Sequence, residues 1–308
     1  MSTQSLSFSP KPLYTTGSNG NRKQSISLRN YLFEKFKRHI TLLLEQKKTR
    51  KVASRKGYLN PRVLHKYSFS DNVFQKSINH QSVDTTIVFL IDGSGSMDSS
   101  VTTPVGIVTA MEMCGAVASA FAKANDIVLK GKIPIEVFVK SAPIDSDESL
   151  TGTKNGALVT LTRVFSSHTR VKDYDKLCRL RPRSPIVDDD GHSNGSYTSE
   201  YAILPALNKW IKGNVKTKKC IVFNLTDGET YCTIGNDGFQ FRNQDTKAMR
   251  LKYLRGMPNV TLMLNDRNDR YTGSYGDNLK DTYGDNMLLA SEDFSGALFK
   301  IFAGFLNS

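Results

Sequence analysis

The chain has 308 residues, of which 39% are hydrophobic and 23% are charged. These fractions are typical of a globular protein with a sizeable core, and they exclude a chain that is disordered throughout. The net charge of +13 is unevenly distributed: residues 1–80 contain 16 Lys or Arg and 3 Asp or Glu, whereas residues 81–308 contain 26 of each kind. All of the positive excess therefore lies in an N-terminal arm, which precedes a charge-balanced unit.

The N-terminal residues and the cysteine spacing indicate a cytoplasmic protein. Residues 1–11 have no basic cluster followed by an apolar run, and no segment approaches the ~18 consecutive apolar residues that a membrane span needs. We therefore expect no contact with a membrane. The four cysteines, Cys114, Cys178, Cys220 and Cys232, show no CxxC spacing. We expect them to be reduced structural thiols.

The N-terminal arm divides into two parts. Residues 1–24 are rich in Ser, Gly, Asn and Pro and have no hydrophobic period, which predicts a flexible tail. Residues 25–80 form a basic helical extension, in which apolar residues at helical spacing predict an amphipathic helix over residues 27–48, capped by Ser25 or Ser27. Residues 47–62 contain seven Lys or Arg, and they form either a solvated connector or a strip that contacts an acidic partner.

Residues 81–308 show the alternation of an α/β domain. A continuous β-branched and apolar run predicts a strand over residues 85–91, covered on both faces. Residues 104–123 would place apolar side chains around the whole circumference of a helix, which predicts a buried helix with Pro104 in its first turn. Further strands are expected over residues 133–139, 158–165, 220–225, 260–264 and 286–290, and further helices over residues 202–211, 246–255 and 291–306. This order predicts a Rossmann-like fold, with a mostly parallel central sheet and helices on both faces.

The first strand ends in a loop that is suited to a metal ion. Asp92-Gly93-Ser94-Gly95-Ser96 brings one carboxylate and two hydroxyls to one point, because the two glycines permit a sharp turn. Such hard oxygen ligands favour Mg²⁺ or Mn²⁺ over zinc. Magnesium prefers about six oxygen ligands, so a second strand must contribute. The strand over residues 220–225 leads into Asp227, which we place at the same carboxyl edge of the sheet.

These polar residues also have interpretations other than metal binding. The Asp-Gly-Ser-Gly-Ser segment could be only a polar turn that caps the next helix. Residues 188–190 are three aspartates followed by His192, and they form either a second cation site or a solvated acidic loop. No nucleophile, base and orienting group can be assigned together, and no Gly-x-x-x-x-Gly-Lys-Ser/Thr loop is present. We therefore expect no catalytic activity of the chain's own.

The combination of Asp-x-Ser-x-Ser with a distant Asp-Gly resembles the metal-ion-dependent adhesion site (MIDAS) of von Willebrand factor A (VWFA) domains. In that family two serines and a threonine bind the metal directly, and the aspartates act partly through water. The resemblance implies that Ser94 and Ser96 are direct ligands, and that Asp92 and Asp227 bind directly or through water. It also requires a threonine ahead of a helix, for which Thr198 is the candidate. The alternatives at that position are Ser196, Ser199 and Glu200.

A narrower resemblance concerns Gly57-Tyr58-Leu59-Asn60, Val73-Phe74-Gln75-Lys76 and the strand and loop over residues 83–97. These segments are similar to the C-terminal part of the CobT-type subunit of aerobic cobaltochelatase, in cobalamin biosynthesis. That subunit works with an AAA+ ATPase, and other VWFA partners of MoxR-type ATPases share some of the pattern. The resemblance implies a non-catalytic adaptor whose metal site is completed by an acidic residue of the ATPase. This chain lacks the long acidic central region of those subunits and has the basic arm and residues 142–197 instead.

The basic arm supports an alternative function. Clustered Lys and Arg neutralise phosphates whatever the sequence bound, so residues 22–66 could bind nucleic acid while the VWFA-like domain is structural. An acidic protein partner would explain the same charge. Binding that depends steeply on salt and does not depend on metal would favour nucleic acid.

Overall fold

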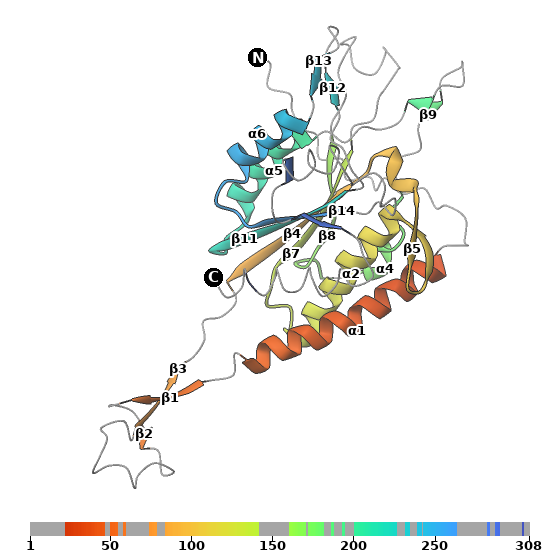
Figure 1. Ribbon diagram of the computed structural model, residues 1–308. Helices are drawn as coiled ribbons and strands as arrows, with labels where there is room; N and C mark the ends of the chain where they lie inside the picture. The colour runs from red at the N-terminus through yellow and green to blue at the C-terminus, as the bar shows by residue number, and fades with distance from the viewer. Residues whose placement is uncertain are drawn as a thin grey trace.

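The computed structural model describes residues 22–46, 50–54, 58–59, 74–78, 84–141, 160–170, 172–181, 186–187, 193–194, 200–226, 232–234, 239–241, 243–263, 282–283, 287–289 and 304. Its centre is a six-stranded sheet in the order β15-β14-β11-β4-β7-β8 (Figure 1). These strands are β15 (Met287–Leu289), β14 (Asn259–Met263), β11 (Lys219–Thr226), β4 (Thr85–Asp92), β7 (Ile135–Ser141) and β8 (Thr160–Ser166). All neighbours pair in parallel except β7 and β8, which are antiparallel. The mostly parallel sheet confirms the predicted α/β class.

Strand β4 lies in the middle of this sheet, and both of its faces are covered. All eight of its residues are buried, and alternate side chains point into two different hydrophobic clusters. Phe89 belongs to the cluster on the side of α1 (Arg22–Gln46) and α2 (Ala110–Val128). Leu90 belongs to the cluster with α5 (Glu200–Asn214) and α6 (Asn243–Tyr253). Helices therefore cover both faces of the sheet (Figure 1), as the apolar run predicted.

Helix α2 is buried almost completely because it lies between the sheet and α1. Phe121 of α2 meets Phe89 of β4 on one side, with ring centroids 5.9 Å apart, and Phe36 of α1 on the other, at 5.4 Å. The predicted start of this helix was wrong. Pro104 lies in the turn between β5 (Ser100–Thr103) and β6 (Gly106–Thr109), an antiparallel hairpin, and the helix starts only at Ala110.

Helix α1 packs along α2 as part of the same core, in which Leu28, Leu32 and Phe36 are buried. The predicted caps were wrong, since the helix starts at Arg22 and Ser25 lies inside it. The Ser25 hydroxyl instead donates a hydrogen bond to the carbonyl oxygen of Cys178, at 2.9 Å. Cys178 directly follows the short helix α4 (Tyr174–Leu177), so this bond ties α1 to α4.

The remaining strands form small separate sheets. The segment predicted as a basic connector or contact strip contains β1 (Arg50–Ser54) and β2 (Tyr58–Leu59), which pair with β3 (Phe74–Ile78) away from the central sheet (Figure 1). Two further antiparallel pairs are β9 (Ile186–Val187) with β10 (Ser193–Asn194), and β12 (Cys232–Ile234) with β13 (Phe239–Phe241). The predicted tail up to residue 21 and most of the predicted helix over residues 291–306 lie outside the described residues. Among the helices that the structure describes, none has the length and apolar character needed to cross a membrane.

Three of the cysteines, Cys114, Cys178 and Cys220, are buried and reduced. Burial raises the pKa of Cys178 to about 11 and that of Cys220 to about 12, so the reactive thiolate is scarce at pH 8. In a Cys232→Ser variant we expect no thiol to react with dithionitrobenzoate at pH 8 in the native state. All three thiols should react in concentrated urea. Rapid native reaction would show that these cysteines are accessible.

Candidate metal centre

Asp92 ends strand β4 and is fully buried at the carboxyl edge of the sheet. Its Oδ1 accepts a hydrogen bond from the backbone N–H of Ser94, at 2.9 Å. Its Oδ2 accepts one from the hydroxyl of Thr226, the last residue of β11, at 2.7 Å. The carboxylate therefore joins the loop after β4 to the end of the neighbouring strand, and its orientation is set by two donors.

The two serines of the loop place their hydroxyls side by side. Ser94 Oγ and Ser96 Oγ are 3.0 Å apart. Magnesium holds oxygen ligands at about 2.0–2.1 Å in an octahedron, which puts adjacent ligand atoms about 3.0 Å from each other. Ser94 is buried and Ser96 is exposed. The serine pair thus fits two adjacent positions of a Mg²⁺ or Mn²⁺ ion that can be reached from the surface.

These hydroxyls are not used to cap a helix. Ser94 precedes the short 3₁₀ helix η2 (Gly95–Asp98), but its side chain makes no capping hydrogen bond. Helix α2 is capped by Thr109, whose hydroxyl accepts from the Glu112 N–H while the Glu112 carboxylate accepts from the Thr109 N–H. This is a complete capping box. The expectation that this polar turn caps the next helix was therefore wrong.

Lys140 is a member of the site that the sequence did not reveal. It lies opposite Asp92 in the register of β4 and β7, and its Nζ is 3.8 Å from Asp92 Oδ2. Its side chain is only 1% exposed, which is rare for lysine unless the ammonium is paired. The Lys140 carbonyl oxygen also accepts from the Gly93 N–H at 2.7 Å. Lys140 thus balances the buried charge of Asp92 and holds the first glycine of the loop.

The predicted ligands divide into those that the structure describes and those that it does not. Asp92, Ser94 and Ser96 lie together as expected, whereas Asp227, Thr198, Ser196 and Ser199 lie outside the described residues. The proposed acidic site at residues 188–190 and His192 also lies outside them. Glu200 is the first residue of α5, and its side chain is not described. Thr226 was missed as a site residue, although its place directly before Asp227 at the end of a strand was a usable signal.

Comparisons with known proteins leave the family open. No family model matches the chain, and no curated protein matches it. Among solved structures, the chain is similar to the pilus adhesin SpaC from Lactobacillus rhamnosus GG, at 14% identity and a TM-score of 0.40. The match covers 75% of this chain and 31% of the adhesin, so this chain spans less than a third of that protein.

Proposed function

We propose that this chain is a VWFA-type protein that binds a partner protein through a Mg²⁺ or Mn²⁺ ion held by the loop after β4. The observation that supports this most is the pair of serine hydroxyls 3.0 Å apart beside a carboxylate with fixed orientation. The loop lies at the carboxyl edge of a mostly parallel sheet, next to the end of β11. Ligands of such sheets bind at this edge.

In this proposal each side chain has a separate task. Ser94 and Ser96 bind the ion directly, and Asp92 is held by Ser94 and Thr226 so that it binds directly or through water. Asp227 and Thr198 complete the set on the strength of the MIDAS resemblance. When bound, the ion supplies a coordination position that a partner's Asp or Glu carboxylate can fill. The exposure of Ser96 leaves that side open to a partner.

The partner that we propose is an AAA+ ATPase of the MoxR type, as the resemblance to the CobT-type subunit of cobaltochelatase suggests. The chain would then be a non-catalytic adaptor in an ATP-dependent process of the cobalamin-biosynthesis kind. The contribution that we propose is recognition, which is the role that the resemblance implies, and Asp92, Ser94 and Ser96 would serve it by holding the ion.

The packing of α1 bears on the nucleic-acid alternative. Several basic side chains of this helix have partners within the protein: Arg29 is buried and pairs with Asp175, and Lys35 lies over the ring of Tyr31 at 4.8 Å. Lys23, Lys37 and Arg38 are exposed. The helix therefore offers fewer cations to phosphates than its sequence suggests. Nucleic-acid binding is kept as an alternative result of the experiments described below.

Direct metal binding can be tested without a partner. Ser96→Ala removes one proposed ligand and should weaken Mn²⁺ binding by about tenfold or more, measured by electron paramagnetic resonance. Ser96 is exposed, so the fold should be kept. Asp98→Ala is the matched control because Asp98 is an exposed acid in the same short helix. Equal affinities for wild type, Ser96→Ala and Asp98→Ala would contradict the site.

Partner binding is tested by capture from a lysate that contains MoxR-type ATPases, in Mg²⁺ and in EDTA, with identification by mass spectrometry. We expect the ATPase to be retained by the wild type and by Asp98→Ala only when metal is present. Ser96→Ala and Asp92→Ala should not retain it. Recovery of nucleic acid in place of an ATPase, lost in high salt and unaffected by EDTA, would support the alternative.

A further inference from the structure

A second site lies at the opposite edge of the sheet from Asp92. A cavity of about 510 Å³ is lined by residues from the first parts of β4 and β7, from the end of β8 and the turn after it, and from the end of α5 and the segment that follows. Its volume is within the range of small-molecule sites, which is roughly 300–1,000 Å³. Because Glu136 is at the start of β7 and Lys140 is near its end, the cavity is separate from the metal loop.

The polar centre of this cavity is Glu136, which is 4% exposed. One carboxylate oxygen, Oε1, accepts a hydrogen bond from the Ser166 hydroxyl at 2.7 Å. The other, Oε2, is buried and has no hydrogen-bond partner among the residues that the structure describes. Nη1 of Arg163 forms an ion pair with Oε2 at 3.9 Å, a distance that is too long for a hydrogen bond. A buried acceptor without a donor is costly, so a ligand that donates an N–H or O–H to Oε2 would be stabilised there.

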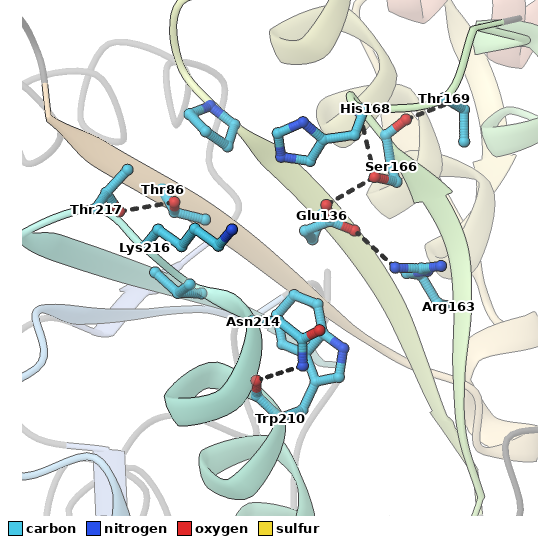
Figure 2. A pocket seen from close by; sticks show the side chains of 12 residues that line it. Thr86, Glu136, Arg163, Ser166, His168, Thr169, Trp210, Asn214, Lys216 and Thr217 are labelled. Atoms are coloured by element: carbon cyan, nitrogen blue, oxygen red, sulfur yellow. Dashed lines mark hydrogen bonds and ion pairs between the residues drawn. The ribbon is translucent and has the colours of Figure 1, made fainter.

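The surroundings of Glu136 indicate the rest of the ligand. Figure 2 shows Lys216 extending toward the middle of the cavity from one side, with Arg163 and His168 on the other. These groups make the rim basic and suited to an anion. Trp210 forms one wall, and its ring packs edge-on against Phe138 with centroids 4.8 Å apart. An indole in a cavity wall favours a planar, aromatic ligand.

We propose that this cavity binds a small anion with a planar body that donates hydrogen bonds, the chemical class of a nucleoside monophosphate. Its ring lies against Trp210, an amino or imino N–H of the ring donates to Glu136 Oε2, and its phosphate meets Lys216 and Arg163. Carboxylates accept hydrogen bonds from base amino groups in this way in protein–nucleic acid contacts. The site is independent of the metal site and of the proposed adaptor function.

Trp210 is the single tryptophan of the chain, so its fluorescence reports on this cavity. The full chain is titrated in EDTA with AMP, GMP, CMP and UMP, with the four nucleosides, and with inorganic phosphate, using free N-acetyltryptophanamide to correct for absorbance. At least one monophosphate should quench Trp210 saturably, and its nucleoside should bind about tenfold more weakly. Calorimetry on the same pairs checks the dissociation constants. Failure of every monophosphate at millimolar concentration, in both measurements, would overturn the proposal.

Two variants separate the parts of the site. Lys216→Ala should weaken binding of the monophosphate several-fold and leave binding of the nucleoside unchanged. The matched control is Lys212→Ala, because Lys212 is an exposed lysine of α5 that lies outside the cavity. Glu136→Gln should weaken both ligands by about tenfold. Burial raises the pKa of Glu136, so its charged form is disfavoured in the fold and the neutral amide should be tolerated. Monophosphate binding that neither Lys216→Ala nor Glu136→Gln alters would place the ligand elsewhere and reject this site.

Discussion

Lys140→Met is expected to lower the free energy of unfolding by about 3–5 kcal/mol in EDTA, because it removes one partner of a buried ion pair. The ammonium is 3.8 Å from Asp92 Oδ2, and both side chains are at most 1% exposed. Methionine fills most of the volume of the lysine side chain but carries no charge. The loss would be measured by urea unfolding, with the exposed Lys209→Met of α5 as control. That control should change stability by no more than about 0.5 kcal/mol.

The same variant should respond more strongly to divalent cations than the wild type. A cation bound by Ser94, Ser96 and Asp92 stabilises the folded state in proportion to the logarithm of its concentration over its dissociation constant. With Lys140 present, the ammonium repels that cation and already balances Asp92. We therefore expect Mg²⁺ to recover part of the stability that Lys140→Met loses. A variant as stable as wild type in EDTA would show that the pair contributes no net stability.

Gly115→Ala is expected to cost about 3 kcal/mol or more, because helix α2 meets α4 without space for a side chain. A Cβ at residue 115 would lie 1.8 Å from the carbonyl oxygen of Leu177. Backbone must therefore move, and overpacking of this kind typically costs 1–3 kcal/mol and occasionally more. α4 cannot withdraw freely, since Ser119 donates to the Tyr174 carbonyl at 2.8 Å and Ser25 donates to that of Cys178 at 2.9 Å.

The matched control for this glycine is Gly213→Ala in α5. In the described part of the chain, no heavy atom lies within 4 Å of the position that its Cβ would take, and alanine is a better helix former than glycine. That substitution should stabilise the protein by about 0.4–1 kcal/mol. Urea unfolding of the two variants compares them directly. Equal stabilities would mean that α4 moves away from α2 at little cost.

The features that could be predicted are those that depend on neighbouring residues. The apolar run that became β4 and the Asp-Gly-Ser-Gly-Ser turn are continuous in sequence, so their periodicity and turn chemistry are visible without the fold. The buried helix α2 was predicted for the same reason. Its start was wrong because Pro104 suits both a first helical turn and a tight hairpin. Only the structure shows the hairpin of β5 and β6 ahead of the Thr109 capping box.

The features that only the tertiary structure decided are those that join distant segments. Lys140 reaches Asp92 because β7 lies beside β4 in a register that pairs these two residues, and no local pattern reveals which strands become neighbours. The antiparallel β8 places Ser166 and Arg163 beside Glu136 for the same reason. Sequence by itself determined an α/β chain with an oxygen-rich loop after the first strand of its central sheet. The counter-charge of that loop and the second cavity were decided by strand order and register, which depend on the packing of the whole sheet.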